Sequence, residues 1–188
     1  MRIIDDFFSN ADLKIFKDLL EKEVVQEHRQ NVGCDFNDYK EICGIENSDF
    51  YPIKLDAKKM FINRLVEKSL IDAEGPDSKN ILMRYLKARA PYQGLWHQDR
   101  FSDSGEVDVI GLTFFLNENW NYADGGLYLY KDQGNEDGYF VIPKDNRLMF
   151  NDTDREHGVT PITNPNVVRK SVQVFMYASL LKTNDYYR

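Results

Sequence analysis

From Ile81 onwards the chain is a series of short strand-like runs separated by turns. The runs are rich in Val, Ile, Phe and Tyr, and Gly, Pro and Asn lie between them. This spacing is typical of a β-sandwich or barrel, and a jelly roll of two four-stranded sheets fits the number of runs. We expect strands at residues 81–86, 94–99, 107–117, 126–131, 138–142, 147–151, 156–160 and 167–181.

Two amphipathic helices are expected before these strands, one over residues 10–24 and one that Asp56 can cap. Apolar residues recur at helical spacing in both: Leu13, Phe16 and Leu20 in the first, Ala57, Phe61 and Leu65 in the second. We expect both helices to pack on the outside of one sheet. The predicted fold class is mainly β with N-terminal α-helices, a double-stranded β-helix (jelly roll). We expect one domain over residues 1–188, with a helical part at 1–75 and a jelly-roll core at 80–182.

Residues 28–53 are polar, acidic and aromatic, and show no clear period. Two interpretations stay open: an ordered loop or irregular hairpin on the surface, or a lid that covers a substrate. Cys34 and Cys43 lie nine residues apart in this segment and match no zinc-binding spacing. We expect both thiols to stay reduced.

Charge and hydropathy exclude some partners. The net charge is −7 and no dense Lys/Arg cluster occurs, so a nucleic-acid partner is not expected. No apolar run approaches the roughly 18 residues that read as a membrane span. Acidic residues interrupt the apolar start of the chain, which therefore does not resemble a signal peptide. We expect a cytoplasmic protein without a membrane attachment.

Two histidines and a carboxylate form the pattern that points most directly to chemistry. His97 and Asp99 lie two residues apart, so in a strand both side chains leave the same face. His157 follows sixty residues later in another strand-like run. Two histidines and one carboxylate on one face of a metal form the facial triad of non-haem Fe(II) oxygenases, which leaves positions open for chemistry. The alternative is that these are ordinary core histidines.

Arg169 lies twelve residues after His157 and opens the last strand-like run. Alternation places Arg169, Ser171 and Gln173 on one face of this strand, and the apolar residues between them on the other. The polar face is the candidate interior, and the apolar face would pack under the helices. By itself an arginine here would be interpreted as a surface residue, but its spacing from His157 favours the interior.

From about Ile81 to Ala178 the chain resembles the 2-oxoglutarate/Fe(II)-dependent dioxygenases, and most closely the prolyl 4-hydroxylase-like branch. The resemblance covers a little over half of the chain, with the motifs in the family's order. The matching segments are Arg84-Tyr85, His97-Gln98-Asp99, Thr113 to Trp120, Asp124 to Leu129, Leu148-Met149-Phe150, His157 to Ile162 and Arg169-Lys170-Ser171. The connection from Tyr85 to His97 is longer than is usual in that branch.

The resemblance implies a role for each of these residues. The Fe(II) ligands and catalytic residues would be His97, Asp99 and His157. Arg169 would pair bidentately with the distal carboxylate of the cosubstrate 2-oxoglutarate, and Ser171 and Tyr85 would contact the same carboxylate. O₂ would be the oxidant, with ascorbate as a reductant. The candidates to face the substrate are Arg100, Asn117 and Trp120.

The implied reaction is hydroxylation of a prolyl or other side chain of a peptide or protein, with release of succinate and CO₂. Hydroxylation of a free amino acid or small metabolite is an alternative. A jelly-roll module that binds a metal without turnover is an alternative of another class, and succinate release would separate it from an enzyme. Nucleic-acid-demethylating relatives carry a second Arg six residues after the first, where this chain has Phe175. Halogenating relatives lack the carboxylate ligand, which here is Asp99.

Overall fold

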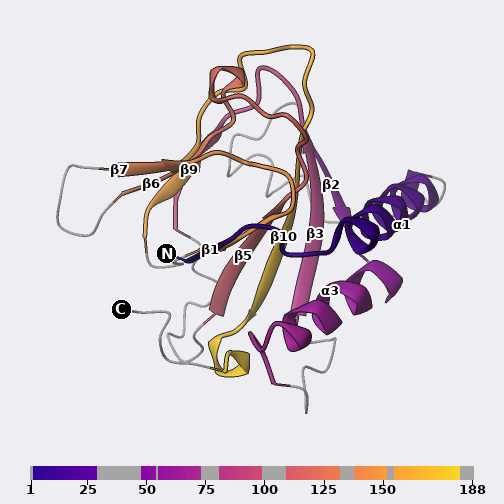
Figure 1. Cartoon of the computed structure of the whole chain (residues 1–188). Coiled ribbons are helices and arrows are strands. Elements are labelled where there is room, and N and C mark those ends of the chain that lie inside the picture. The colour runs from indigo at the N-terminus through magenta and orange to yellow at the C-terminus, as the bar shows by residue number, and fades with distance from the viewer. Residues whose placement is uncertain are drawn as a thin grey trace.

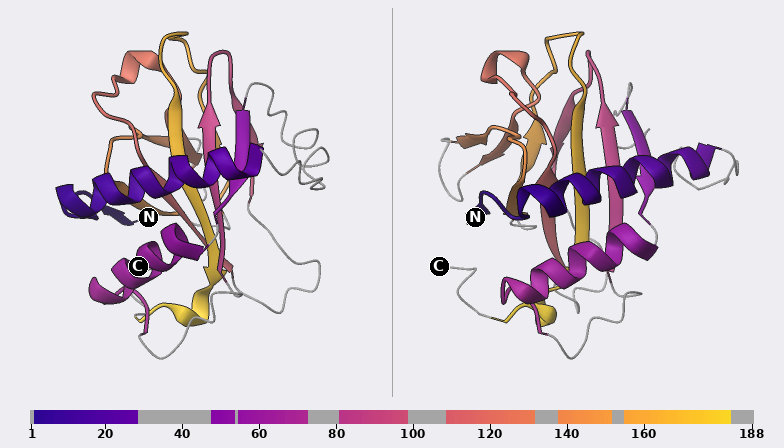
Figure 2. Two further views of the ribbon diagram at one scale, coloured as in Figure 1. Left: turned by 90° about the vertical axis from the view of Figure 1, so that its right-hand side faces the viewer. Right: turned by 45° about the vertical axis from the view of Figure 1, so that its right-hand side comes forward.

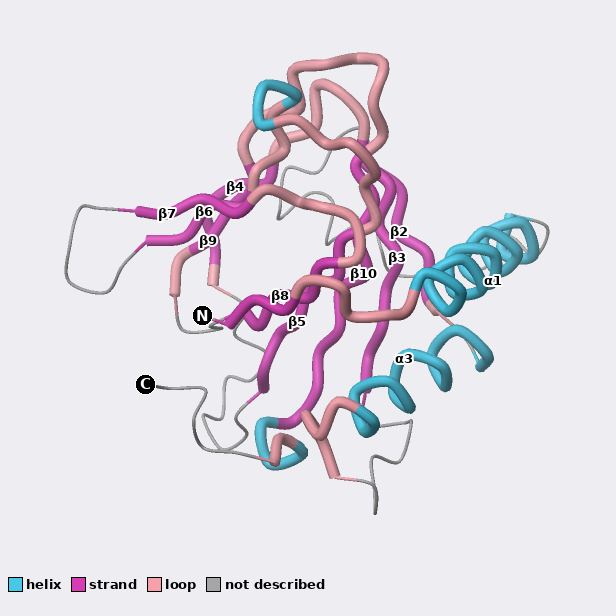
Figure 3. The backbone as a smooth tube through the Cα atoms, viewed as in Figure 1, coloured by secondary structure: helices cyan, strands magenta, loops and turns pink. Residues whose placement is uncertain are grey.

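The computed structural model describes residues 2–28, 48–53, 55–72, 81–98, 109–131, 138–151 and 155–182. In these residues two antiparallel sheets face each other, and two helices lie on the outer side of the larger sheet (Figures 1 and 3). The helices are α1 (Asn10–His28) and α3 (Leu55–Glu67), and short 3-10 helices span Tyr122–Asp124 and Ala178–Leu180. In this part of the chain no helix combines the length and apolar character needed to cross a membrane.

The strands of the two sheets are not in sequence order. The larger sheet runs β1 (Arg2–Ile4), β8 (Arg147–Asn151), β5 (Val109–Phe115), β10 (Arg169–Tyr177), β3 (Ile81–Ala88) and β2 (Ser48–Pro52). The smaller sheet runs β4 (Gly94–His97), β9 (His157–Val159), β6 (Tyr128–Lys131) and β7 (Gly138–Val141). The long β10 lies between β5 and β3, so its side chains reach the middle of both faces of the larger sheet.

The main hydrophobic core lies between the larger sheet and the helices (Figure 2). Phe16 from α1 and Phe61 from α3 both pack on Phe114 of β5, with ring centroids 5.8 and 5.7 Å from that of Phe114. Because strand side chains alternate, β10 turns Val172 and Val174 towards these rings, and both are fully buried. Burying a large apolar side chain stabilises a fold by about 1.5–3 kcal/mol, so this core holds the helices against the sheet.

The other face of the larger sheet is turned towards the smaller sheet. Phe115 and Met149 of the larger sheet pack with Tyr128 and Val141 of the smaller one. The same face of β10 begins with the buried, charged Arg169. The space between the sheets is therefore where a polar site is embedded in apolar surroundings.

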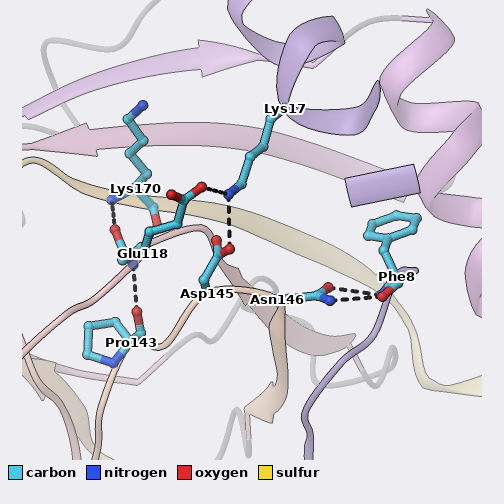
Figure 4. Close-up of polar contacts among 8 residues, drawn as sticks. Phe8, Lys17, Glu118, Pro143, Asp145, Asn146 and Lys170 are labelled. Carbon is cyan, nitrogen blue, oxygen red and sulfur yellow. Dashed lines mark hydrogen bonds and ion pairs between the residues drawn. The ribbon is translucent and has the colours of Figure 1, made fainter. Parts of the chain in front are cut away.

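Polar contacts fix the N-terminal segment to the loops around the larger sheet (Figure 4). Asn146 exchanges two hydrogen bonds with the backbone of Phe8, of 2.8 and 2.9 Å. Lys17 of α1 donates to Glu118 at 2.6 Å and to Asp145 at 2.9 Å. These bonds hold the loop after β5 and the turn before β8 next to the start of the chain.

The observed architecture agrees with the predicted jelly roll and with its outer helices. The eight strands expected after Ile81 are all present and divide four and four between the sheets, and β1 and β2 extend the larger sheet at its two edges. Residues 48–52, expected to belong to a surface loop, an irregular hairpin or a lid, form the edge strand β2. The rest of that segment, with Cys34 and Cys43, lies outside the described residues. Helix α1 continues to His28, four residues beyond the predicted end.

Candidate active site

His97 and His157 lie side by side on one face of the smaller sheet. They are directly opposite each other in β4 and β9, and their ring centroids are 4.4 Å apart at an interplanar angle of 59°. Directly opposite residues in antiparallel strands project from the same face, so both imidazoles reach one point, as a shared metal requires. Asp99, the third predicted ligand, and Arg100 lie outside the described residues, among which no group of three metal-ligating side chains occurs.

His157 is oriented by its surroundings. It is only 4% exposed, and its Nδ1 lies 3.0 Å from the carbonyl oxygen of Arg155. A carbonyl only accepts hydrogen bonds, so in the neutral imidazole the proton sits on Nδ1 and the lone pair on Nε2. The ring stacks on Tyr128, with centroids 5.3 Å apart, and Tyr128 packs against Phe115 of the larger sheet. The imidazole is thus held between the sheets with the lone pair of Nε2 available to a metal.

Strand β4 approaches β9 closely because Gly94 has no side chain. A Cβ atom at Gly94 would lie 3.1 Å from the Cβ of Val159, closer than ordinary van der Waals contact. The register of the two strands shifts between Gly94 and His97. Such irregularities are common beside active sites, where they re-aim a side chain. Here the side chain concerned is His97.

Arg169, the first residue of β10, is a buried cation, with 2% of its surface exposed. Its Nε donates to the carbonyl of Gly126 at 2.8 Å and its Nη1 to the hydroxyl of Ser171 at 3.3 Å. The guanidinium carbon lies 5.3 Å from the ring centroid of Phe115. In the described residues no carboxylate pairs with Arg169. Because an unpaired buried charge is costly, a bound anion is the expected counter-charge.

Two phenols act on the Arg169 guanidinium. Burial lowers the pKa of Arg169 below its ordinary value, and the smaller electrostatic influence of Tyr92 and Tyr128 opposes this shift without cancelling it. Tyr92 is buried in a cluster with Ile162, and Tyr128 also stacks on His157. A phenol can donate to a carboxylate that Arg169 holds. Tyr128 stacks on His157 and packs with Phe115, whose ring lies beneath the guanidinium of Arg169.

Gly126 provides the space that the Arg169 side chain occupies. Its φ of 62° lies in the left-handed region that glycine adopts without strain. A Cβ atom there would lie 3.0 Å from the Cδ of Arg169 and 3.2 Å from the ring of Trp120. The indole N–H of Trp120 donates to the carbonyl of Gly125 at 3.0 Å. The glycine turn thus both orients Arg169 through a carbonyl and leaves room for it.

Tyr85, predicted to contact the cosubstrate, lies on the other face of the larger sheet. It is opposite Val172 in the register of β3 and β10, so it faces the helices. Its hydroxyl donates to Glu21 of α1 at 3.0 Å, and it lines a surface groove of about 410 Å³ between α1 and the loop after β5. The structure does not bring Tyr85 to Arg169, and the phenols that do lie near Arg169 are Tyr92 and Tyr128.

Asn117 and Trp120, two of the predicted substrate-facing residues, fix loops. The side chain of Asn117 donates to the carbonyl of Pro143 at 2.7 Å and accepts from the backbone N–H of Lys170 at 2.6 Å (Figure 4 shows the partners). The indole N–H of Trp120 donates a hydrogen bond to the carbonyl of Gly125. Both side chains position the backbone around Arg169 and also line the surface groove. Their contact with a substrate stays a prediction.

Ser171 and Gln173 continue the interior face of β10 beyond Arg169. Ser171 is fully buried and accepts from Arg169. The Oε1 atom of Gln173 is buried and receives no hydrogen bond from the described residues. Its neighbour on β5 is Thr113, whose hydroxyl bonds to Asn151. This wall of the interior is polar, and Gln173 offers an acceptor to a bound molecule.

The sequence reasoning missed both phenols beside Arg169. Tyr92 lies in the long connection that precedes His97, and Tyr128 follows Gly126 by two residues in a run where Tyr and Leu alternate. The only local signals in the sequence were the unusual length of the connection from Tyr85 to His97 and the alternation of Tyr128 with Tyr130. Both tyrosines come near Arg169 only because distant segments of the chain pack together, and no local sequence pattern predicts that packing.

Comparison with known proteins identifies the family. A sequence profile described as the 2OG-Fe(II) oxygenase superfamily matches residues 82–177, just over half of the chain. None of the curated proteins compared matches the sequence. The structure is similar to a Pseudomonas putida prolyl-4-hydroxylase, with a TM-score of 0.63 at 16% identity over 94% of this chain and 91% of that one.

Two further solved structures share the fold. A Trichoplax adhaerens prolyl hydroxylase, in complex with a peptide fragment of the hypoxia inducible factor oxygen degradation domain, gives a TM-score of 0.65 at 15% identity over 95% of this chain and 83% of that one. HygX from Streptomyces hygroscopicus, with nickel, 2-oxoglutarate and hygromycin B bound, gives a TM-score of 0.58 at 11% identity over 94% of this chain and 82% of that one. At these identities the structures establish the jelly-roll fold and the profile establishes the family. The chain belongs to the 2OG-Fe(II) oxygenase superfamily and is a dioxygenase that uses Fe(II) and 2-oxoglutarate.

Proposed function

We propose that this dioxygenase hydroxylates a prolyl or other side chain of a peptide or protein. In this proposal the Fe(II) ligands are His97, Asp99 and His157. Arg169 and Ser171 bind the distal carboxylate of 2-oxoglutarate. The observation that carries the proposal is the buried Arg169, which pairs with no carboxylate of the described residues and is connected to His157 by the packed rings of Phe115 and Tyr128.

The residues present fit both groups. His97 and His157 are close enough to share one metal, and Asp99, two residues after His97, offers the carboxylate of a facial triad. The guanidinium of Arg169 presents donors in a planar fork that matches a carboxylate. Its surroundings contain phenol and hydroxyl donors but no competing anion among the described residues.

The chain's own residues would bind and orient the reactants. When bound, Fe(II) allows O₂ to convert 2-oxoglutarate and a substrate C–H into succinate, CO₂ and a C–OH, with one oxygen atom going to each organic product. The backbone carbonyl of Arg155 keeps the Nδ1 proton of His157 in place, so the lone pair of Nε2 would be free to bind the metal. Arg169 fixes the far end of the cosubstrate, and the rings of Phe115 and Tyr128 reduce access of water to it.

A peptide and a small molecule are both bound in structures of similar fold. The Trichoplax adhaerens enzyme carries a peptide fragment and HygX carries hygromycin B. We favour a peptide because two of the three similar structures described above are prolyl hydroxylases. A free amino acid or small metabolite is the alternative substrate, and the assay has to include both classes.

The test of the reaction is release of succinate with Fe(II), ascorbate and 2-oxoglutarate, measured over proline-containing peptides, free amino acids and aminoglycosides. We expect a peptide to stimulate release and to gain 16 mass units. Stimulation only by a free amino acid or an aminoglycoside would overturn the peptide assignment.

The metal ligands are tested by binding rather than by turnover. We expect His97→Ala and His157→Ala each to weaken Co(II) binding, measured by calorimetry, by at least about tenfold, because each removes one of three ligands. His28→Ala is the matched control, since His28 lies at the end of α1, far along the chain from the motif. Equal Co(II) affinity in all three variants would exclude the two histidines as ligands.

A further inference from the structure

The two candidate metal ligands begin a row of four aromatic side chains across the smaller sheet. His97 is opposite His157, His157 is opposite Tyr130, and Tyr130 is opposite Tyr139. Opposite residues in antiparallel strands share a face. All four rings therefore project from the face of the smaller sheet that is turned towards the larger sheet.

The two tyrosines form a stacked pair at the end of this row. Their ring centroids are 5.4 Å apart at an interplanar angle of 24°. Tyr130 packs against the interior cluster that contains Phe115 and Met149, whereas Tyr139 on the edge strand β7 is 54% exposed. The row thus leads from the buried His157 to an aromatic surface open to solvent. In Figure 1 these strands lie on the side opposite α1 and α3.

We propose that Tyr130 and Tyr139 form a docking shelf for the substrate peptide, on which a prolyl or aromatic ring near the hydroxylated residue packs. This inference rests on the proposed peptide hydroxylation. Tyrosine offers a large rigid contact area at little conformational cost and is enriched at protein interfaces. Stacked or edge-on ring contacts add about 0.5–1.5 kcal/mol beyond area burial, so a ring on the peptide is the side chain that gains most here.

The length of the row sets which peptide residue reaches the shelf. Neighbouring strands are about 4.8 Å apart, so Tyr139, two strands from His157, lies roughly 10 Å from it across the sheet. An extended peptide advances about 3.3 Å per residue. A ring three residues from the hydroxylated residue would therefore lie over Tyr139. A free amino acid spans too little to contact the metal centre and the shelf at once.

The experiment uses blocked nine-residue peptides with one central proline. Otherwise they contain only Ser and Gly, except that Phe replaces Ser three residues before or three residues after the proline. Peptide and 2-oxoglutarate dissociation constants are measured by calorimetry on the full chain loaded with Fe(II) under argon. We expect one of the two Phe peptides to bind wild type about tenfold more tightly than the all-Ser peptide, and Tyr139→Ala to abolish this preference while Tyr139→Phe keeps it.

Phe140→Ala is the matched control. Phe140 is 59% exposed and adjacent on β7, but alternation turns it to the outer face of the same strand. We expect it to keep the Phe preference. The proposal is wrong if Phe140→Ala and Tyr139→Ala lose the preference equally, or if neither peptide shows one. It is also wrong if Tyr139→Ala changes the oligomeric mass in light scattering without affecting the peptide, because the tyrosines would then contact a second copy.

The two proposals fail in different ways. If peptides stimulate succinate release but Tyr139→Ala binds them as wild type does, the peptide hydroxylase stands and the shelf does not. If no peptide binds and free proline stimulates release, both are overturned. The dissociation constant of 2-oxoglutarate, obtained in the same titrations, shows whether the site around Arg169 survives in each variant.

Discussion

Replacing Arg169 by Met should separate binding of the cosubstrate from stability of the fold. The substitution keeps most of the side-chain volume and removes the charge. It also removes the hydrogen bonds to Gly126 and Ser171, of 2.8 and 3.3 Å, each worth about 1.5–3 kcal/mol for a charged donor. Against this, the fully buried guanidinium no longer bears a desolvation penalty of several kcal/mol. We expect these effects to cancel to within about 2 kcal/mol in the ligand-free protein.

The ligand then reveals the function of the charge. With 2-oxoglutarate at one hundred times its dissociation constant, wild type should gain about 2.7 kcal/mol of stability. For a chain of this size that corresponds to a rise in melting temperature of about 5–10 °C. Loss of one member of a buried charge pair costs about 3–5 kcal/mol, so the affinity of Arg169→Met should fall at least a hundredfold and the same ligand concentration should leave its melting temperature nearly unchanged.

The assay is thermal unfolding followed by circular dichroism, under argon with Fe(II), with and without 2-oxoglutarate. Lys170→Met is the control, because Lys170 is adjacent on β10 but faces α1, where it pairs with Glu21 at 3.3 Å. It should keep the full ligand shift. If Arg169→Met keeps the shift as well, the cosubstrate does not bind at Arg169. If the ligand-free variant loses far more than 3 kcal/mol, the guanidinium is a structural element.

Two more changes test the surroundings of the site. Gly126→Ala places a Cβ atom 3.0 Å from the Cδ of Arg169 at a residue with φ 62°. We expect a loss of about 1–2 kcal/mol of stability from backbone strain and at least tenfold weaker binding of 2-oxoglutarate, measured by calorimetry. Unchanged affinity would show that the Arg169 side chain can move away from the new methyl group at no cost to binding. Burial alone would raise the pKa of Glu21, but hydrogen bonds from Lys87 and Tyr85 outweigh it, so the pKa of Glu21 in the folded state lies below its ordinary value. A lowered folded pKa gives stability that is present above the unfolded pKa and is lost as the pH falls through the folded value. Glu21→Gln should therefore cost about 1 kcal/mol at pH 7 in urea titrations, and a cost that does not shrink as the pH falls below the unfolded pKa would contradict this assignment.

The fold was accessible from the sequence because its signals are local. Period-two runs with Gly and Asn turns predicted all eight core strands, and the 3.6-residue period of Phe16 and its neighbours predicted the outer helices. The edge strands were missed because β1 and β2 are short and pair with β8 and β3, which lie far away in sequence. Nothing within residues 2–4 or 48–52 indicates that an edge strand of the sheet is available for pairing.

Residue alternation predicted the faces of site residues reliably only within a single strand. Alternation along β10 placed Arg169 and Ser171 on one face, and the structure shows them hydrogen-bonded. Tyr85 needed the register between β3 and β10, and a shift of one residue moves a side chain to the opposite face. It lies opposite Val172, one position from the partner of Ser171. Tyr92 needed the packing of distant segments of the chain, which is information from outside any strand.

The buried cation also explains why the side chains of Asn117 and Trp120 hold backbone segments beside it. A guanidinium preorganised to receive a carboxylate must be kept in place while that carboxylate is absent, because binding then requires little reorganisation. Trp120 holds the carbonyl of Gly125, and the next residue, Gly126, accepts from Arg169. Asn117 holds the backbone of Lys170, the residue after Arg169. Two side chains that resembled substrate contacts in the sequence thus fix the backbone on both sides of the cation, and substituting either should weaken 2-oxoglutarate binding without touching the ligand.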